Sequence, residues 1–341
     1  MKKLNYIDKI IYLLNSVFAA VLLLSYVLPF VAPKVFSALS VLSLSVPVLL
    51  VVNFIFLLYW VLKVKKQLLL SVLVLAIGYK NISTLYQFST SEVAKNKTHQ
   101  LTVMSYNVRL FNLYNWIETP NLQEEISSFI KKENPDVVAF QEFHPHKKVN
   151  LKQYSYQYKS LSKGKVKYGQ AIYSKYEIID KGVIVFKDSQ NKAIFSDIVK
   201  NKDTLRIYNV HFESLHINPN VEDLKEADKE LLVKRIGGKF VLQQDQAQQV
   251  LVHQEKCRYK KIILGDFNNT AYSYMYKQFK KADYQDAFEL AGHGFGKTFN
   301  FKFFPLRIDF ILVDKKLAAH KFRNYNHKFS DHYPIKVEVV W

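Results

Sequence analysis

The stretch ILGDFNN, residues 263–269, joins a short apolar run to a glycine, an aspartate and two asparagines. The run Lys261–Leu264 has the composition of a buried β-strand, so we expect Asp266 and Asn268 just beyond a strand end. Side chains at such an end can project from a rigid sheet into a cleft. Glycine, aspartate and asparagine also favour simple turns, so this segment alone does not separate a turn from a site.

The same arrangement recurs in five other segments, each an apolar run that delivers a carboxylate, an amide or an imidazole. They are SYNVRLF with Asn107, VVAFQEF with Glu142, IYNVHFES with His211, RIDFILVD with Asp309, and FSDHYPI with Asp331 and His332. Taken singly, such residues are more often solvated loop residues or structural histidines, and the SDH triplet could cap a helix. Taken together, they predict one cleft lined by strand ends.

Many strands and few helices are expected after residue 100. The β-like runs are Leu101–Val108, Val137–Phe143, Gln170–Tyr173, Gly182–Phe186, Ala193–Val199, Thr204–His211, Lys261–Leu264, Arg307–Val313 and Ile335–Val340. Apolar residues have helical spacing in Leu122–Lys132 and in a long stretch from Val221 to Cys257. This combination favours a layered α/β fold with mixed or antiparallel sheets.

The candidate residues suit the cleavage of a phosphate ester. Their oxygen-rich, sulfur-free set fits a hard cation such as Mg²⁺, which Glu142 and Asp331 could hold. The reaction also requires an activated water, which Asp266 could orient or deprotonate. His332 could bind the phosphate, and Asp309 beside it would favour the charged form of the imidazole.

In this order, the six motifs resemble those of the endonuclease/exonuclease/phosphatase superfamily, whose members share a DNase I-like fold. The resemblance covers about residues 100–341. Its most specific part is GDFN, followed by an arginine-isoleucine-aspartate strand and a terminal SDH-x-P. The resemblance implies a four-layer α/β sandwich, in which two mixed β-sheets pack face to face between flanking helices.

By motif position, the resemblance also implies a role for each residue and a requirement for Mg²⁺, with Mn²⁺ as a substitute. Asn107 and Glu142 would belong to the metal site, with support from Asp331. Asp266 and Asn268 would position water and phosphate. His211 would contact the scissile phosphate, and the Asp309–His332 pair would stabilise the transition state. Arg109 stands where some nucleases of the family have an aspartate, so a metal ligand is lost there. His211 matches DNase- and sphingomyelinase-like members, which weakens a DNA-repair interpretation.

The first quarter of the chain has a different composition. The net charge of +19 divides into +7 for residues 1–90, which hold one acid, and +12 for the remainder. The apolar segments 10–33 and 35–62 each exceed the length that spans a bilayer, and 67–88 is a shorter candidate for a third span. Cys257 is the only cysteine, which excludes an intrachain disulfide and argues against a zinc–thiolate site.

We therefore expect a transmembrane region at 1–89, a polar linker at 90–100 and a catalytic domain at 101–341. Lysines before the first span and at 63–66 place these ends in the cytoplasm. Three spans would put the catalytic domain outside the cytoplasm, as in a protein of a bacterial inner membrane, whereas two would leave it inside. We favour three spans, although 67–88 could instead lie in the membrane plane.

The expected function is that of a membrane-anchored, Mg²⁺-dependent phosphoesterase acting on phosphodiester bonds of nucleic acid or of a phospholipid headgroup. Tethering at the membrane suits a lipid substrate. Basic charge with many aromatic residues suits single-stranded nucleic acid, although most of these aromatics fall in core-like strands. The alternative is a catalytically silent membrane-tethered domain that binds phosphorylated ligands or a protein partner. The sequence does not indicate an oligomeric state.

Overall fold

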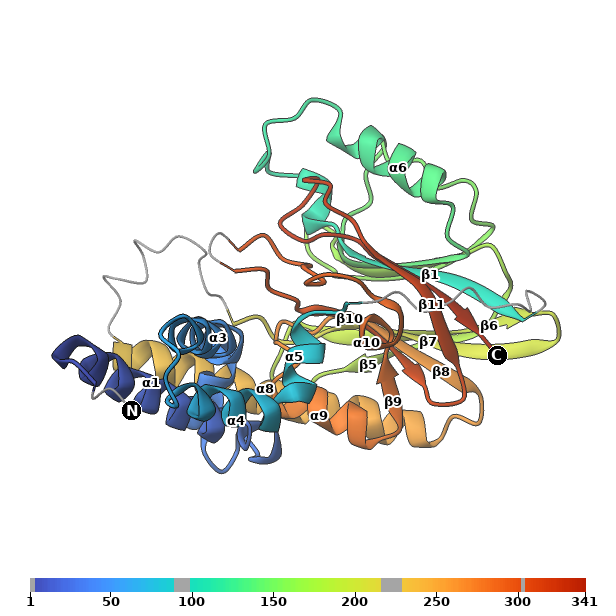
Figure 1. Ribbon diagram of the computed structural model, residues 1–341. Helices are drawn as coiled ribbons and strands as arrows, with labels where there is room; N and C mark the ends of the chain where they lie inside the picture. The colour runs from blue at the N-terminus through green and yellow to red at the C-terminus, as the bar shows by residue number, and fades with distance from the viewer. Residues whose placement is uncertain (1–3, 89–98, 216–228, 302–303) are drawn as a thin grey trace.

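The computed structural model describes residues 4–88, 99–215, 229–301 and 304–341. Two six-stranded sheets form its centre (Figure 1). The first has the order β11-β12-β1-β2-β4-β3, with β1 at Gln100–Asn107, β2 at Val137–Phe143, β3 at Tyr156–Leu161, β4 at Gly169–Ser174, β11 at Ala318–Asn324 and β12 at Ile335–Val340.

The second sheet has the order β5-β6-β7-β8-β10-β9. Its strands are β5 at Ile178–Val185, β6 at Lys192–Lys200, β7 at Asp203–His211, β8 at Lys260–Asp266, β9 at Tyr284–Asp286 and β10 at Asp309–Asp314. Both sheets are mixed, because β1 pairs with β2 and β7 with β8 in parallel while the other neighbours are antiparallel.

The sheets pack face to face through aliphatic side chains that alternate along each strand, such as Val103, Ile207 and Ile311. The outer face of the first sheet is covered by α6 (Leu122–Glu133), whose acidic first turn and basic last turn complement the helix dipole. Helices α8 (Lys229–Glu255) and α9 (Tyr274–Lys281) cover the outer face of the second sheet. Figure 1 shows these layers from top to bottom, and the predicted four-layer sandwich is confirmed.

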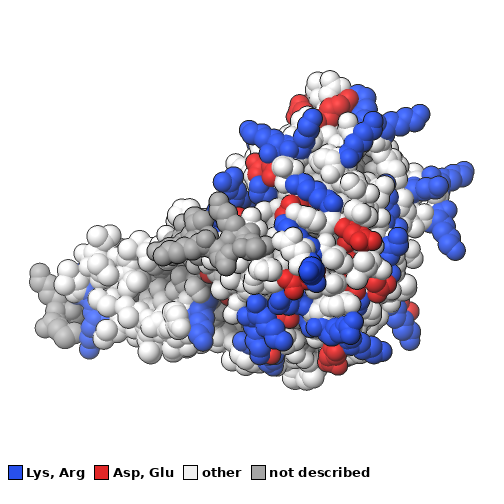
Figure 2. All heavy atoms as spheres, turned by 90° about the vertical axis from the view of Figure 1, so that its right-hand side faces the viewer, with Lys and Arg blue, Asp and Glu red and all other residues white. Residues whose placement is uncertain are grey.

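The N-terminal region consists of helices with apolar outer surfaces. They are α1 (Tyr6–Ser25), η1 (Leu28–Phe30), α2 (Ser37–Val41), η2 (Leu42–Ser45), α3 (Val46–Leu62), α4 (Leu68–Ile77) and α5 (Tyr79–Leu85). Two segments, Tyr6–Phe30 and Ser37–Leu62, are long and apolar enough to cross a membrane, close to the predicted 10–33 and 35–62. Helices α4 and α5 meet at 73°, so the expected third segment is bent. Figure 2 shows this region protruding from the charged body with few charged atoms.

The two regions are packed against each other rather than joined only by a tether. The Lys34 ammonium lies 2.5 Å from the Asp245 carboxylate of α8. The Tyr272 hydroxyl donates to the Asn81 carbonyl at 3.0 Å. A Cβ at Gly237 of α8 would lie 2.9 Å from the backbone of Ser37, so α2 and α8 approach as closely as a glycine allows.

All the predicted strands and the predicted helix at 122–132 are present. The edge strands β3, β9 and β11, the short α10 (Ala287–Ala291) and α9 were not predicted. The long predicted helix corresponds to α8, and its expected first residues, 221–228, lie outside the described residues. Most of the expected linker, residues 90–98, also lies outside them, and β1 begins at Gln100.

Candidate active site

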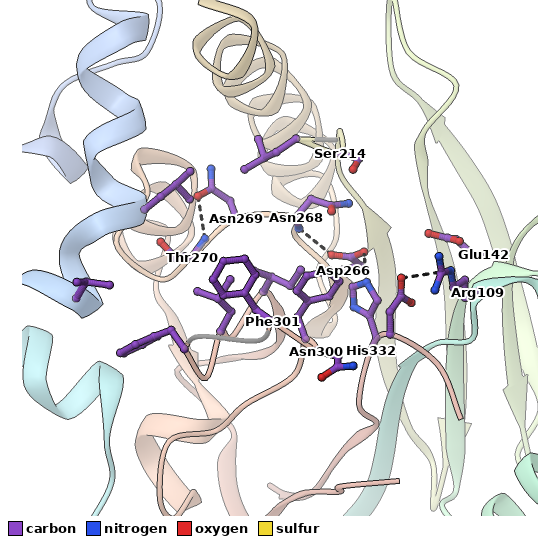
Figure 3. Close-up of a pocket in the computed structure, with 18 residues that line it drawn as sticks. Arg109, Glu142, Ser214, Asp266, Asn268, Asn269, Thr270, Asn300, Phe301 and His332 are labelled. Atoms are coloured by element: carbon purple, nitrogen blue, oxygen red, sulfur yellow. Dashed lines mark hydrogen bonds and ion pairs between the residues drawn. The ribbon is translucent and has the colours of Figure 1, made fainter. Parts of the chain in front are cut away.

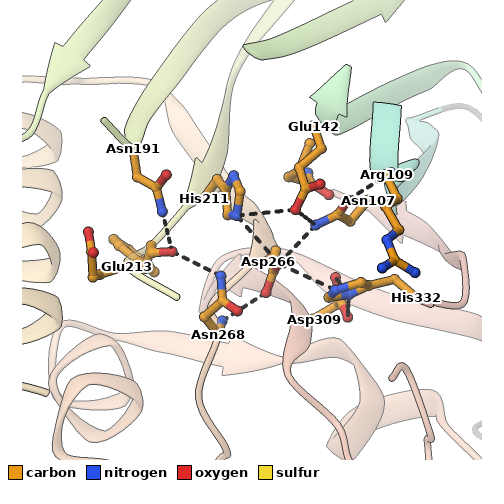
Figure 4. Close-up of polar contacts among 12 residues, drawn as sticks. Asn107, Arg109, Glu142, Asn191, His211, Glu213, Asp266, Asn268, Asp309 and His332 are labelled. Atoms are coloured by element: carbon orange, nitrogen blue, oxygen red, sulfur yellow. Dashed lines mark hydrogen bonds and ion pairs between the residues drawn. The ribbon is translucent and has the colours of Figure 1, made fainter. Parts of the chain in front are cut away.

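Three of the predicted residues lie side by side at one end of the second sheet. The parallel register of β7 and β8 places His211 opposite Asp266, and the antiparallel register of β8 and β10 places Asp309 opposite the same aspartate. The strand-end pattern in the sequence therefore corresponds to one row across three adjacent strands. Figure 4 shows these side chains pointing toward a common centre.

The GDFN segment turns sharply as it leaves β8. Gly265 has a φ of +140°, and a Cβ there would lie 2.0 Å from the Val210 carbonyl oxygen, so a residue with a side chain would be strained. The Asp266 carboxylate accepts from the backbone N–H of Asn268 at 2.8 Å. The Asn268 amide in turn donates to the Phe212 carbonyl at 3.0 Å. The segment is thus both a turn and the support of a buried carboxylate.

The first sheet contributes Asn107 and Glu142 from the ends of β1 and β2. The register between β2 and β4 shifts after Phe140, and Glu142 has a φ of +48° at this bulge. The Asn107 amide donates to Glu142 at 3.1 Å and to Asp266 at 3.0 Å, which links the two sheets. In this orientation the Asn107 oxygen accepts from the Arg109 N–H at 3.1 Å.

His332 and Asp309 form the pair predicted from the sequence. Nδ1 of the histidine lies 2.9 Å from an Asp309 oxygen, and Nε2 lies 3.7 Å from Asp266. Burial alone lowers the pKa of His332, but the Asp309 and Asp266 carboxylates outweigh burial and raise this pKa to about 10. The imidazole is therefore charged at neutral pH, which is the state suited to binding a phosphate.

Burial is the main cause of the pKa shifts of Asp266, Glu142 and His211. Burial raises the pKa of Asp266 to about 6, against the opposing effect of His332. It raises the pKa of Glu142 and lowers that of His211, whose Nε2 lies 3.6 Å from Asp266 and 3.9 Å from Glu142. Carboxylates are thus crowded in a place where water does little to stabilise their charge.

Such crowding fits a divalent cation, which would stabilise the charged carboxylates. Among the described residues, Asp266, Asp309 and His332 form one buried group whose ligand atoms lie within 4.8 Å of one another and could hold a metal ion. The predicted metal residues, Asn107 and Glu142 with Asp331, are a different set that adjoins this group. Their role as ligands stays a prediction.

Asp331 lies at the rim of the same centre. Its carboxylate is 3.3 Å from Nε of Arg109, and it accepts from the Ser330 hydroxyl at 3.1 Å. The Arg109 guanidinium also stacks over the Trp116 ring at 4.4 Å. Arg109 therefore stands where some nucleases have a metal-ligand aspartate, and its cation pairs with Asp331.

Two cavities meet at these residues. The first measures about 530 Å³ and is lined on its polar side by Arg109, Glu142, Asp266, Asn268, Asp331 and His332. Its other lining residues include Leu44, Val48, Leu215, Phe299, Phe301 and Phe304. In Figure 3 Glu142, Arg109 and His332 lie on the right, Phe301 lies near the middle, and the blue N-terminal helices lie on the left. The second cavity, of about 810 Å³, is lined by polar residues that include Glu142, His211, Tyr168, Asp188, Asn191 and Glu213.

Sequence reasoning missed several residues that support the centre. Glu213 lines the polar cavity and accepts from Lys239 at 2.6 Å, although it stands only two positions after His211 in the quoted motif. The Thr298 hydroxyl accepts from the Asp309 N–H at 3.0 Å and so holds the start of β10. The Asn209 amide, buried between the sheets, donates to the Phe140 carbonyl at 2.8 Å. Glu213 and Asn209 both stand in the quoted motif IYNVHFES, two positions from His211, whereas Thr298 had no signal in the sequence.

The two-sheet α/β sandwich and this group of side chains define a class of protein whose architecture is consistent with phosphoesterase activity. The model of the endonuclease/exonuclease/phosphatase family matches residues 104–332, and the chain belongs to that family. The model of a domain of unknown function matches residues 8–85. No curated protein matches the chain.

Solved structures of low sequence identity share the fold. A Bacteroides vulgatus endonuclease/exonuclease/phosphatase is 16% identical, with a TM-score of 0.55 over 70% of this chain and 98% of that one. A Bacteroides thetaiotaomicron protein of the family is 20% identical, with a TM-score of 0.52 over 72% and 99%. The mannosyl-6-phosphatase Bt3783 of the same species is 18% identical, with a TM-score of 0.50 over 71% and 100%.

Proposed function

We propose that this chain is a membrane-anchored, Mg²⁺-dependent phosphoesterase that hydrolyses a phosphodiester bond with water. The observation that carries the proposal is the convergence of Glu142, His211, Asp266 and the Asp309–His332 pair on one centre, from the ends of both sheets. The reaction adds water to the phosphorus, breaks one P–O ester bond, and yields a phosphomonoester and an alcohol.

The charge of each side chain determines its proposed role in the reaction. Asp266, whose carboxylate is held by Asn107 and by the N–H of Asn268, orients the attacking water and accepts its proton. His332, kept charged by Asp309, donates to a phosphoryl oxygen as negative charge grows there. His211 and Asn268 bind the phosphate from the other side of Asp266.

Glu142 and Asp331 would hold the Mg²⁺, with Asn107 as a neighbour that positions Glu142. The bound ion would supply charge neutralisation and a more acidic water. The oxygen-only donors at Glu142 and Asp331 match the ligand preference of Mg²⁺ and of Mn²⁺.

The arrangement of the N-terminal helices supports a catalytic domain outside the cytoplasm of a bacterial inner membrane. Asp8 at the start of α1 lies 3.6 Å from Lys63 at the end of α3, so these two ends are together. The opposite ends meet the body, where Lys34 pairs with Asp245, and α5 returns to it through a hydrogen bond from Thr84 to Glu289 at 3.0 Å. The chain would thus cross three times, with its lysine-rich end in the cytoplasm.

Removal and restoration of the metal test the proposal. Full-length protein in detergent should hydrolyse bis(p-nitrophenyl) phosphate in Mg²⁺, lose the activity in EDTA, and recover it when Mg²⁺ or Mn²⁺ is returned. A folded protein that hydrolyses no phosphoester under any of these conditions would refute the proposal and favour a binding domain.

A further inference from the structure

The candidate catalytic residues separate two cavities of opposite chemistry, and Glu142 lines both. Beyond the catalytic group, one cavity presents mainly phenylalanine and aliphatic side chains, together with Asn269, Thr270 and Asn300. The other presents carboxylates, amides and hydroxyls, among them Asp188, Asn191 and Glu213. A molecule whose phosphate lies beside Glu142 would therefore extend in one direction into an apolar space and in the other into a polar one.

The apolar cavity extends from the catalytic histidine to a candidate membrane span. Phe299 packs edge-on against His332, with ring centroids 5.0 Å apart. Leu44 of η2 and Val48 in the first turn of α3 line the same cavity. Val48 is 48% exposed although it is apolar. Because α3 continues to Leu62 as a helix long enough to cross a membrane, the cavity lies next to the expected membrane surface.

The wall of the cavity formed by Leu44 and Val48 is held in place by packing with the catalytic domain. Leu44 packs against a cluster that contains Leu215 and Phe240, where α8 meets η2. The close approach of Ser37 to Gly237 and the ion pair between Lys34 and Asp245 lie in the same contact region. The N-terminal helices are therefore positioned to shape the substrate site, in addition to anchoring the protein.

The charge of the two cavities argues against a polyanionic substrate. Arg109 is the only lysine or arginine among the described residues that line them, and it pairs with Asp331. Asp188 and Glu213 add carboxylates to the polar cavity, and Lys239 balances the charge of Glu213 from 2.6 Å. A nucleic acid would bring further phosphates, which proteins bind through several cations. Carboxylates and amides instead accept hydrogen bonds from hydroxyl or amine groups.

We infer that the substrate is a membrane lipid phosphoester and that the N-terminal helices form part of its binding site. The apolar chain occupies the cavity lined by Leu44, Val48 and Phe299. The phosphate lies between Glu142 and His332, and a hydroxyl- or amine-bearing headgroup occupies the polar cavity. The inference rests on the proposed phosphoesterase function and adds the class of substrate to it.

The first test compares two phosphodiesters that differ only in their acyl chains, with a nucleic acid as a third substrate. Full-length protein in mixed micelles is assayed with dioctanoylphosphatidylglycerol, with deacylated glycerophosphoglycerol and with oligo(dT). We expect kcat/KM for the acyl-bearing ester to exceed that of the deacylated compound by at least tenfold, since one buried methylene contributes roughly fourfold to affinity. Equal rates with glycerophosphoglycerol, or preference for oligo(dT), would overturn the inference.

A pair of variants tests the wall itself. Val48→Trp fills the cavity, whereas Ile55→Trp places the same side chain on the same face of α3, two turns deeper, outside the cavity. The ratio of lipid to bis(p-nitrophenyl) phosphate turnover should fall about tenfold in Val48→Trp, a loss of two buried methylenes or more. The ratio should stay at the wild-type value in Ile55→Trp. Equal ratios in both variants would contradict a lipid site at this wall.

A binding measurement separates this inference from the proposed reaction. Glu142→Gln protein in EDTA is exposed to phosphatidylglycerol with a diazirine in one acyl chain, and the adducts are mapped. We expect adducts on peptides containing Val48 or Phe299, reduced by excess dioctanoylphosphatidylglycerol. Adducts spread over the outer faces of α1 and α3 without competition would refute the lipid site. Failure of the wild type to hydrolyse even the aryl ester would refute the reaction, without affecting this measurement.

Discussion

The N-terminal helices and the α/β sandwich place the same types of residue on opposite sides. The helices expose their aliphatic residues and bury a polar group, in which Asn15 donates to Ser71 and accepts from Trp60, both at 3.0 Å. The sandwich buries its aliphatic residues and gathers polar side chains such as Asp266 at the strand ends. Buried polar groups thus fix helix packing in one region and carry chemistry in the other. We expect the sandwich to determine whether a bond is broken, and the helices to influence which molecule reaches it.

The largest effect is expected from the carboxylates at the strand ends. Glu142→Gln and Asp266→Asn keep the shape of each side chain and remove its charge. Each should lower kcat/KM by at least about 10³-fold, because an acid–base or metal-binding function is lost. The measurement is hydrolysis of bis(p-nitrophenyl) phosphate at saturating Mg²⁺.

Asp283→Asn is the matched control, because its carboxylate is exposed and pairs with Lys315 at the surface. It should retain wild-type activity. All three proteins should melt within a few degrees of the wild type, since each change is nearly isosteric. Full activity in either catalytic variant would exclude the roles assigned to Glu142 and Asp266.

The pH dependence of the hydrolysis rate should be a smaller effect than these substitutions, and it reports on two residues at the same strand ends. Asp266 has a raised pKa of about 6 and must lose its proton to act as a base, so the rate should rise about tenfold per pH unit below 6. His332 has a raised pKa of about 10 and must keep its proton, so the rate should fall above 10. A bound cation would move the acidic limb to lower pH.

His332→Ala separates the two limbs. The variant should be about 10²-fold slower at pH 8 and should lack the decline near pH 10, while the acidic limb remains. A decline that persists unchanged in this variant would assign the basic limb to another group.

The strand ends were predictable, and the surroundings of the site largely were not. Apolar runs that end in Asp266 or His211 locate a site because parallel strands end at the same edge of a sheet. The edge strands β3 (YQYKSL) and β11 (AAHKFRN) escaped detection because they contain few apolar residues and are largely exposed. The bulge that turns Glu142 into the site, with φ of +48°, depends on a register shift against β4 that no local pattern signals.

The wall formed by Leu44 and Val48 was also outside the reach of sequence reasoning. Both residues belong to apolar segments whose composition predicts contact with lipid, and nothing in their spacing distinguishes a lining residue from a lipid-facing one. Their position depends on how the N-terminal helices pack against α8, which is a tertiary contact between distant parts of the chain.

The smallest effect should come from the contact between the two regions, which two neighbouring glycines of α8 can probe. A Cβ at Gly237 would meet the Ser37 backbone at 2.9 Å, whereas one at Gly238 meets nothing within 4 Å. Both changes to alanine gain the same helix propensity, about 0.5–1 kcal/mol, so their difference isolates the contact. Gly238→Ala should therefore melt slightly above the wild type and Gly237→Ala below it. Gly237→Ala should also lose a few-fold in lipid turnover relative to bis(p-nitrophenyl) phosphate, because α2 must move. Identical melting and identical substrate ratios in the two variants would show that the helices do not communicate with the site through this contact.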